Sequence, residues 1–338
     1  MNIRDNKMNI ILYGTGKRFR SFIDCKFYAE ALKRHDYHVV GVYDKAKAGE
    51  RVTVGNGSFV VGTQADCVQG ASDCIAITSD KYFDEIADEL TALGVARERL
   101  IKLSEIETGL EDDVYTFQRF DGRYGIEIGG PSHCFAEIYR RCRGCDDVNF
   151  SADTVWWKKK ENVYRGGTRT LGKVFIADAV DLSMIADAKY DFVLSSNNLE
   201  HIANPLKAVA EFVRILKPGG YLVIVVPFKE KTFDHRRPYT AFEHLLEDYK
   251  RDIGEDDLTH LPEIAALHDY EMDPPCGGRE NFLRRSKENF KNRCLHQHVF
   301  SEETLRGIYD YFQVEVLSFA CLGANLVCVG ERAAKSMI

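Results

Sequence analysis

The ten residues Tyr124–His133, Tyr-Gly-Ile-Glu-Ile-Gly-Gly-Pro-Ser-His, constrain the fold more than any other stretch of the chain. Ile126 and Ile128 alternate as in a short buried strand, and the glycine pair 129–130 predicts a tight turn. An amphipathic helix is expected to follow from Cys134. A strand, a glycine turn and a helix in this order place backbone N–H groups at the carboxyl edge of a sheet, where open α/β folds bind ligands.

Length and composition indicate a soluble protein with two domains. The chain has 338 residues, of which 45% are hydrophobic and 29% are charged. The net charge of −7 argues against nucleic acid as the main partner, and no apolar run is long enough to span a membrane. Ten cysteines without a framework spacing, and an N-terminus without a signal-peptide core, predict a cytoplasmic protein with reduced thiols.

The first hundred residues alternate between strand and helix patterns, which predicts a parallel sheet with right-handed crossovers. Strands are expected at 8–13, 39–43, 59–61, 74–78 and 100–103, and helices at 18–34 and 81–93. The first strand ends at Gly14-Thr-Gly16, and the second ends at Asp44. This layout is that of a nucleotide-binding half-fold, so Gly14, Gly16 and Asp44 form a candidate ligand site. The third glycine of the dinucleotide fingerprint is missing, which argues against NAD.

Three segments of this region, Tyr-Gly-Thr-Gly, Gly-Val-Tyr-Asp and Ile-Ala-Ile-Thr-Ser, resemble parts of a known domain type. Residues 8–106 are similar to the small Rossmann-like domains of bacterial surface-polysaccharide proteins, including the sugar-binding half of sugar O- and N-acyltransferases. The resemblance implies a bound sugar nucleotide. A docking module without a ligand is the equal alternative, since fold alone does not establish function.

The rest of the chain predicts a second α/β domain after a polar linker at 107–123, so that the domains are 1–106 and 124–338. Further strands are expected at 148–150, 174–177, 190–194, 221–226, 314–319 and 326–331, and helices at 134–143, 205–216 and 301–311. A polar, mostly helical insertion at 229–298 follows the fifth strand of this domain. Insertions at that position lie over the edge where ligands bind, so we expect an acceptor pocket or a lid.

The second domain contains five short motifs whose order along the chain can be compared with known families: Glu127-Ile-Gly-Gly, Asp178-Ala, Asp191-Phe-Val-Leu-Ser-Ser, Leu199-Glu-His-Ile-Ala-Asn-Pro and Arg214-Ile-Leu-Lys-Pro-Gly-Gly. In order and spacing they resemble the class I S-adenosylmethionine-dependent methyltransferases, and the stretches around residues 233–240 and 296–300 are similar to a bacterial branch associated with glycan and surface-polysaccharide synthesis. The resemblance implies two Rossmann-like domains, the second with a seven-stranded sheet. It also implies methyl transfer to a hydroxyl or amine of a sugar, sugar nucleotide or glycan.

The same resemblance implies the residues of the cofactor site. Glu127 would contact the amino-acid part of S-adenosylmethionine through the turn, and Asp178 would accept from the adenine amino group. The full set implied is Glu127, Gly129, Gly130, Asp178, Ala179, Ser195 and Asn197. Pro131 and His133 depart from the family pattern. The usual ribose-binding acid is also absent, so Asn149, Ser151 or Asp153 would replace it.

Histidines and arginines near the carboxyl edge are the candidates for chemistry on the acceptor. His235 and His201 are the candidate general bases, with a structural role for His201 as the alternative. Arg236 and Arg237 suit a phosphate or carboxylate on the substrate, and His298 is a third substrate candidate. His296 and His298 are two residues apart and could hold a metal, but no nearby carboxylate pair or cysteine completes a site, so we expect none.

Two other functions remain open at the level of sequence. One is a nicotinamide-dependent sugar-nucleotide enzyme that uses the first domain, and the missing fingerprint glycine counts against it. The other is a binding or scaffold protein with a degenerate cofactor loop, which the substitution at Pro131 keeps open. Trp156 and Trp157 are expected to pack against the insertion rather than to stack on a ligand.

Overall fold

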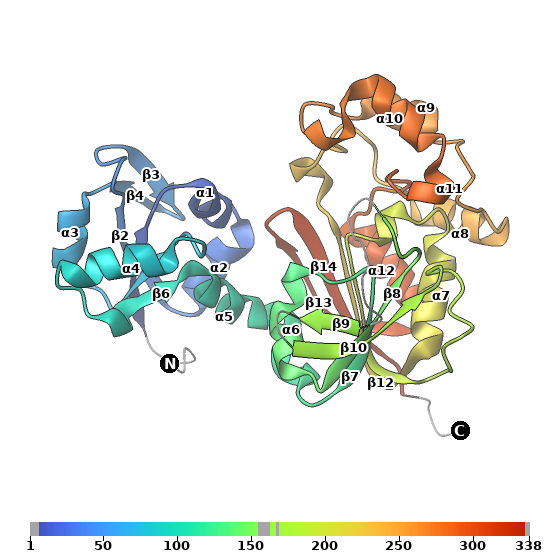
Figure 1. Ribbon diagram of the computed structural model, residues 1–338, viewed down its shortest axis with the longest axis horizontal. Helices are drawn as coiled ribbons and strands as arrows, with labels where there is room; N and C mark the ends of the chain where they lie inside the picture. The colour runs from blue at the N-terminus through green and yellow to red at the C-terminus, as the bar shows by residue number, and fades with distance from the viewer. Residues whose placement is uncertain (1–6, 155–162, 167–168, 335–338) are drawn as a thin grey trace. The chain divides into compact units, whose positions relative to one another are not determined.

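A computed structural model describes residues 7–154, 163–166 and 169–334, which fold into two compact units (Figure 1). The N-terminal unit comprises Met1–Thr116 with Cys321–Gly323, and the C-terminal unit comprises Phe117–Ala320 with Ala324–Ile338. Trp156 and Trp157 lie outside the described residues. Each unit has its own sheet and its own hydrophobic core.

The N-terminal unit is built on a four-stranded parallel sheet in the order β2-β1-β5-β6. The strand expected at 59–61 is not part of this sheet, because β4 instead pairs with β3 as an antiparallel hairpin. Its elements are β1 (Met8–Tyr13), α1 (Lys17–Ile23), α2 (Lys26–Arg34), β2 (Tyr37–Tyr43), β3 (Arg51–Val54), β4 (Gly57–Val60), α3 (Gln64–Gln69), β5 (Cys74–Ile77), α4 (Phe83–Ala92), η1 (Arg97–Arg99), β6 (Leu100–Lys102) and α5 (Leu103–Tyr115).

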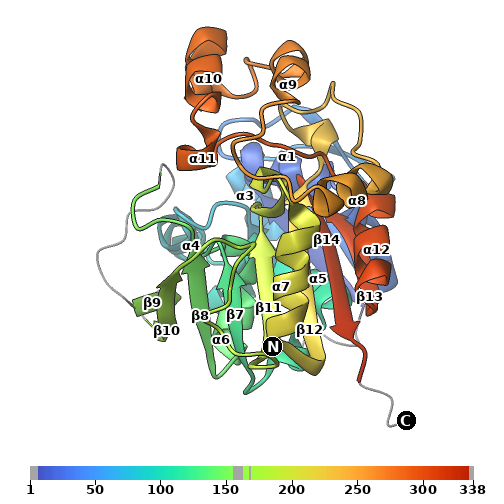
Figure 2. The same cartoon turned by 90° about the vertical axis from the view of Figure 1, so that its right-hand side faces the viewer.

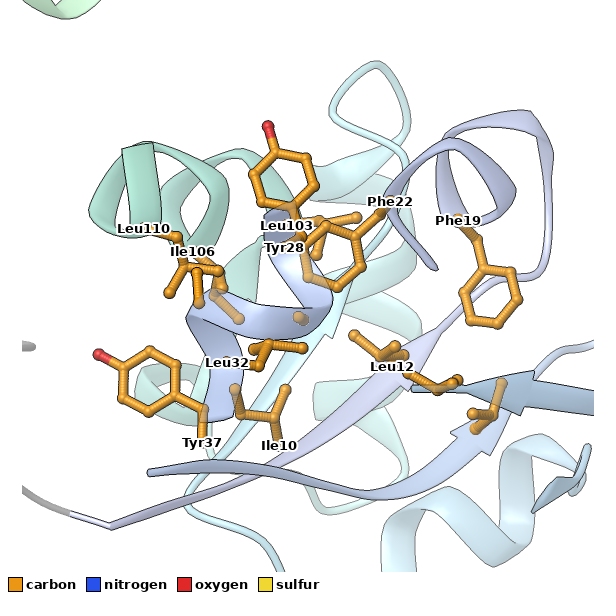
Figure 3. Close-up of a cluster of buried hydrophobic side chains, with 14 of the residues drawn as sticks. Ile10, Leu12, Phe19, Phe22, Tyr28, Leu32, Tyr37, Leu103, Ile106 and Leu110 are labelled. Carbon is orange, nitrogen blue, oxygen red and sulfur yellow. The ribbon is translucent and has the colours of Figure 1, made fainter. Parts of the chain in front are cut away.

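Two hydrophobic layers enclose this sheet because alternate residues of a strand face opposite sides. Ile10 and Leu12 of β1 pack in a cluster with side chains of α1, α2 and α5. Figure 3 shows this cluster. Ile11 and Tyr13 pack on the other face with side chains of α3 and α4. The parallel α/β sandwich predicted from the alternation of elements is therefore present.

The helix expected at 18–34 is divided into α1 and α2, with Asp24 as the C-cap of the first and Cys25 as the N-cap of the second. Phe22 of α1 and Tyr28 of α2 are both buried in the same cluster. They are six residues apart, which is about one and two-thirds helical turns, so one straight helix would point them in different directions. The break lets both side chains reach the core.

Residues 107–115, assigned to a linker from sequence, belong to the helix α5. The polar stretch is one face of this helix. Its other face, with Ile106 and Leu110, is buried in the N-terminal core. The unit boundary therefore lies after Thr116, which is the left-handed C-cap of α5 with φ +46°.

The C-terminal unit is built on an eight-stranded sheet in the order β13-β14-β12-β11-β7-β8-β10-β9. The sequence predicts seven strands. The eighth is β9, which pairs antiparallel with β10 at one edge. The strands are β7 (Tyr124–Ile128), β8 (Gly144–Asn149), β9 (Val163–Gly166), β10 (Arg169–Ile176), β11 (Tyr190–Ser196), β12 (Leu216–Pro227), β13 (Val314–Leu322) and β14 (Asn325–Arg332).

Helices pack on this sheet and continue beyond its edge. The helix α7 packs on β12 and α12 packs on β14. The helices and turns are η2 (Phe117–Phe120), η3 (His133–Phe135), α6 (Ala136–Arg141), η4 (Leu199–His201), α7 (Pro205–Ile215), η5 (Lys229–Lys231), α8 (Phe242–Lys250), α9 (Leu261–Leu267), η6 (Pro274–Cys276), α10 (Gly278–Ser286), α11 (Asn289–Asn292) and α12 (Glu302–Tyr311).

The insertion contributes the helices α8 to α11. Figure 2 shows them gathered beyond the end of the sheet at which β8 and β11 finish. Of these, α9 and α10 share a small hydrophobic core with Ile264, Phe282 and Leu295. The position over the carboxyl edge agrees with the expectation of a pocket wall or lid.

Candidate functional site

The glycine turn after β7 is clamped by side chains of the neighbouring strand β8. Gly129 has φ +86°, a conformation that favours glycine, and its N–H donates to the carbonyl of Val148 at 2.8 Å. The N–H of Gly130 donates to Asp147 Oδ1 at 3.0 Å, and Asn149 Nδ2 donates to the carbonyl of Gly130 at 3.3 Å. The turn is therefore a rigid backbone surface at the sheet edge.

Glu127 lies beneath this turn with its carboxylate fully buried. Its Oε2 accepts hydrogen bonds from the hydroxyls of Tyr139 in α6 and Tyr164 in β9, while Oε1 has no hydrogen-bond partner among the described residues. A Cβ on Gly130 would lie 2.5 Å from both Glu127 Oε2 and the Tyr164 hydroxyl. Glu127 thus ties α6 and β9 to the turn.

Two buried carboxyl groups are neighbours under the turn, because Glu127 pairs with Asp147 in the register of β7 and β8. Burial raises the pKa of Glu127 above its usual value, against the hydrogen bonds that lower it. Burial and the nearby charge of Glu127 raise the pKa of Asp147 well above its usual value. The pair therefore resists simultaneous ionisation.

A pocket opens at the carboxyl ends of β7, β8, β10 and β11. Three of the seven predicted cofactor residues line it, namely Gly129, Asp178 and Ala179. The complete lining is Ile128, Gly129, Val148, Asn149, Phe150, Ala177, Asp178, Ala179, Asn198, His201, Ile202 and Arg293. Asn149, the first of the proposed replacements for the ribose acid, is also in this lining.

Asp178 is paired with an arginine of the insertion. Arg293 Nη2 lies 2.6 Å from Asp178 Oδ2, and Arg293 Nη1 lies 2.7 Å from Glu255 Oε1. The guanidinium also lies 5.3 Å from the centroid of the Phe150 ring. Burial raises the pKa of Glu255 to about 7 although Arg293 opposes the shift. A ligand that binds Asp178 must therefore compete with Arg293.

The two remaining predicted cofactor residues lie at the carboxyl end of β11, Ser195 within the strand and Asn197 just after it. Ser195 is fully buried, and Asn197 has φ +46° with its side-chain amide 3.3 Å from Ser196 Oγ. The next residue, Asn198, lines the pocket, and its side chain would be 3.1 Å from a Cβ on Gly129. The structure thus brings Asn198 to the turn, a residue that sequence analysis did not select.

His201, one of the two predicted catalytic residues, lines the same pocket. Burial, with the neighbouring charge of His296, lowers the pKa of His201 to about 3, so its imidazole is neutral near pH 7. Its ring lies 4.6 Å from that of His296. Beside them Glu200 is fully buried, its two oxygens lack a hydrogen-bond partner among the described residues, and burial raises its pKa to about 7.

The other predicted catalytic residue, His235, is paired with a carboxylate of the insertion. Its Nε2 lies 3.0 Å from Asp269 Oδ2, and Arg236 Nη2 lies 2.7 Å from the same oxygen. Neither His235 nor Arg236 lines the pocket with Gly129. Their roles in catalysis and substrate binding stay predictions.

Arg237 and His298, the other predicted substrate residues, are buried. Arg237 Nη1 lies 3.0 Å from Asp234 Oδ1 and also donates to the carbonyl of His296, while Nη2 donates to that of Gln297. His298 Nε2 lies 3.1 Å from the carbonyl oxygen of Ala203. Both residues line a cleft of the insertion together with Pro238, Tyr239, Thr240, Ala241, His244, His260, Glu263 and Gln297.

In the predicted N-terminal site, the polar groups of Gly14 and Asp44 form hydrogen bonds to neighbouring residues of the same unit. Gly14 has φ +99°, and its carbonyl accepts from Thr78 Oγ1 at 3.0 Å. Asp44 Oδ2 accepts from the N–H of Thr15 at 2.7 Å and from its hydroxyl at 2.8 Å. A cavity of this unit is lined by Phe22, Leu32, Tyr37, Val54, Phe59 and their neighbours, and it includes none of Gly14, Gly16 and Asp44. Ligand binding there stays a prediction.

Residues 126–224 match the family model described as a methyltransferase domain. The match includes the glycine turn, Asp178 and Asn198, and therefore the parts of the sheet that form the pocket. The C-terminal unit thus contains a methyltransferase domain, of the type that uses S-adenosylmethionine. This finding favours an enzyme over the scaffold alternative.

Curated relatives carry the same kind of name. The chain is 28% identical over 149 residues to the chloroplastic tocopherol O-methyltransferase of Arabidopsis thaliana. The aligned region covers 43% of this chain and 39% of the relative. The chain is 41% identical over 69 residues to a demethylmenaquinone methyltransferase of Renibacterium salmoninarum, covering 20% and 29%. The chain therefore spans less than half the length of these relatives.

Among solved structures, the N-methyltransferase NodS of Bradyrhizobium japonicum covers 69% of this chain and 99% of its own, at 11% identity and a TM-score of 0.37. A score this low supports no conclusion. Across the part of the chain that the structure describes, no helix combines the length and apolarity needed to cross a membrane.

Proposed function

We propose that this protein transfers a methyl group from S-adenosylmethionine to a hydroxyl or amine of a sugar, sugar nucleotide or glycan. The main support for S-adenosylmethionine as the methyl donor is the pocket at the carboxyl edge of the sheet. Gly129, Asp178 and Ala179 line this pocket, and all three lie inside the matched methyltransferase domain. Ligands of open α/β folds bind at this edge.

The chemistry of the lining suits this cofactor. Gly129 offers bare backbone for close approach, the Asp178 carboxylate can accept from an adenine amino group, and the Phe150 ring offers an aromatic face. When bound, S-adenosylmethionine supplies a methyl group on a positively charged sulfonium sulfur, which leaves as a neutral thioether. The residues of the chain then need only to align the acceptor and to remove its proton.

His201 and its neighbour Glu200 are the proposed residues for that proton. His201 lines the cofactor pocket and is neutral near pH 7, so it can accept a hydrogen bond from the acceptor, but its pKa of about 3 makes it a weak base. Glu200 is buried beside it, and its pKa of about 7 suits proton removal better. The proposed role of His235 would require the segment around Asp269 to reach the pocket, because the histidine pairs with that carboxylate.

The cleft of the insertion supports a polar acceptor. Its lining includes Arg237, Thr240, Glu263 and Gln297, which can donate to or accept from the hydroxyls of a sugar. A cleft with these charged and amide groups is poorly suited to a long apolar acceptor. Roles in polysaccharide synthesis and in the cytoplasm, and a sugar nucleotide at the N-terminal unit, remain predictions from sequence.

The test is methyl transfer from labelled S-adenosylmethionine to UDP-sugars, glycans and, in parallel, phenols and quinols. Label on a sugar acceptor is the expected result, with saturable binding of S-adenosylmethionine by calorimetry. Label on a quinol would contradict the proposed sugar acceptor but would agree with S-adenosylmethionine as the methyl donor. Absence of S-adenosylmethionine binding by the folded protein would overturn the proposal as a whole.

A further inference from the structure

Three histidines and one aspartate of the insertion converge on one point of the cleft wall. We call them the histidine cluster: His244, Asp248, His260 and His298. His244 and Asp248 are four residues apart on α8, so both point from the same face of that helix. His260 directly precedes α9, and His298 lies before α12. Three segments distant in the sequence thus meet through side chains that bind metals.

The distances within the histidine cluster agree with tetrahedral coordination. His244 Nε2 lies 3.1 Å from His260 Nε2 and 3.2 Å from Asp248 Oδ2. Asp248 Oδ2 lies 3.9 Å from His298 Nε2. Zinc bonds of about 2.0–2.1 Å in a tetrahedron separate neighbouring ligand atoms by about 3.3 Å. The ligand atoms of His244, Asp248 and His298 all lie within 4.8 Å of one another, so one ion could reach these three groups. His260, whose Nε2 lies 3.1 Å from His244 Nε2, would become the fourth ligand by a movement of its ring.

The surroundings of the histidine cluster also suit a bound cation. His298 is 2% exposed and Asp248 is 5% exposed, so the carboxylate lies where an uncompensated charge is costly. His244 Nε2 faces both this carboxylate and the ring nitrogen of His260. His298 Nε2 also lies 3.1 Å from the carbonyl oxygen of Ala203, a contact that a metal ion would replace.

We propose that His244, Asp248, His260 and His298 form a structural site for a divalent transition metal, with Zn²⁺ as the best fit. Three imidazole nitrogens and one carboxylate favour zinc over magnesium or calcium, which prefer oxygen ligands. Four protein ligands close the site, as in structural rather than catalytic zinc centres. The ion would fix α8, the start of α9 and the segment before α12 around the cleft.

The first experiment measures zinc binding to protein that has been treated with a chelator and dialysed. Wild-type protein should bind one Zn²⁺ per chain by calorimetry and metal analysis. Asp248→Asn and His244→Ala should each weaken binding at least about 100-fold, since loss of a supporting partner alone costs 10–100-fold. His38→Ala is the matched control, because His38 is an exposed histidine paired with Asp36 in the N-terminal unit. Its zinc affinity should equal that of the wild type.

Cobalt distinguishes this site from His268–Asp273–Cys276, which offers a thiolate, whereas the Asp248→Asn and His244→Ala variants distinguish it from Glu200–His201–His296, which has no cysteine. Co²⁺ in the histidine cluster should give visible bands of tetrahedral cobalt without the near-ultraviolet band of a thiolate ligand. A thiolate band, or unchanged affinity in both Asp248→Asn and His244→Ala, would overturn the proposal.

Two readouts keep the test independent of folding and of methyl transfer. If the variants fail to fold, zinc should still raise the melting temperature of the wild-type protein, and no shift at saturating zinc would overturn the site. S-adenosylmethionine binding is measured separately, so failure of the metal site and failure of the proposed enzyme give different results.

Discussion

Both units contain a glycine turn after the first strand of their sheet, but the surroundings of the two turns differ. Gly14 and Gly129 both have positive φ angles, and each donates its N–H at 2.8 Å to the carbonyl of a residue on the neighbouring strand, Tyr43 and Val148 respectively. In each unit a carboxylate also accepts a hydrogen bond from the backbone N–H of the next residue of the turn. Asp44 accepts from Thr15, and Asp147 accepts from Gly130.

The difference lies in what surrounds the two turns. The N-terminal turn is completed by its own neighbours, Thr15 and Thr78. Beneath the C-terminal turn lies the buried carboxylate of Glu127 with the hydroxyls of Tyr139 and Tyr164, and a pocket opens beside it. The comparison teaches that a strand–glycine–helix pattern specifies a clamped turn, whereas a ligand pocket depends on residues contributed from elsewhere in the chain.

The largest expected effect tests the contrast between buried and exposed polar groups in the two units. Asp234 Oδ2 lies 2.6 Å from His296 Nδ1, with both side chains largely buried, whereas His38 Nε2 lies 2.7 Å from Asp36 Oδ1 at the surface. Asp234→Asn should lower the free energy of unfolding by about 3–5 kcal/mol, because it leaves buried cations without their partner. Asp36→Asn should cost about 1 kcal/mol or less.

This prediction includes a pH dependence. Burial opposes ionisation of Asp234, but His296 and Arg237 lower its pKa from 3.8 to about 2, so its stabilising contribution is lost as the pH falls through that range. Burial alone would lower the pKa of His296, but Asp234 raises it above 6.5, so its contribution is lost as the pH rises through the raised value. The cost of Asp234→Asn in urea unfolding should be larger at about pH 5.5 than at about pH 9. Equal costs at both values would contradict it.

The second prediction tests the buried network beneath the C-terminal turn. A Cβ at Gly130 would meet Glu127 and the Tyr164 hydroxyl at 2.5 Å. Gly130→Ala should therefore lower the free energy of unfolding by about 1–3 kcal/mol. It should also weaken S-adenosylmethionine binding, because the turn must shift. Unfolding by urea and calorimetry check the two effects, and wild-type values in both would show that the network is not rigid.

The third prediction compares two carboxylates that follow sheet strands, Asp178 after β10 in the C-terminal unit and Asp44 after β2 in the N-terminal unit. Asp178→Asn should weaken S-adenosylmethionine binding by about 1–3 kcal/mol, because a charged acceptor is lost from the pocket. Asp44→Asn should leave this binding unchanged. Burial alone would raise the pKa of Asp44, but the N–H groups of Ala46 and Thr15 and the Thr15 hydroxyl lower it, so its charge serves the N-terminal turn. Calorimetry of both variants decides, and equal losses would contradict the assignment.

The smallest expected effect on stability is at Gly16. A Cβ there meets nothing within 4 Å, and its φ is −72°, so Gly16→Ala should change the free energy of unfolding by no more than about 0.5 kcal/mol. If the N-terminal unit binds a sugar nucleotide at this turn, the same substitution should abolish that binding. Titration of UDP-sugars into wild-type protein and Gly16→Ala sharpens the comparison, and an unchanged affinity would place the ligand elsewhere.

Local patterns predicted much of the architecture. Alternating residues of β1 face two cores, and the glycines at 14 and 129 adopt the conformations for which glycine is suited. The patterns did not reveal the break between α1 and α2 or the eighth strand β9, because each depends on which side chains reach a shared core or edge. The helix α5 was missed because its polar face resembles a linker.

The residues of the candidate site also fall into those selected from sequence and those found only in the structure. Gly129, Asp178 and Ala179 were selected from motif order and line the pocket. Arg293, which is 115 residues from Asp178 in sequence, has no local signal that assigns it to the same site. Asn198 directly follows a selected residue, yet only the turn after β11 decides which of the two asparagines faces Gly129.

The sequence by itself therefore determined the α/β alternation, the two glycine turns and the methyltransferase type of the second domain, since these follow from periodicity and from residues close together in the chain. Only the tertiary structure decided that Arg293 pairs with Asp178, that Tyr139 and Tyr164 donate to Glu127, and that His244 and His298 lie beside Asp248. The physical reason is that hydrogen bonds and ion pairs act over a few ångströms in space, whatever the separation along the chain.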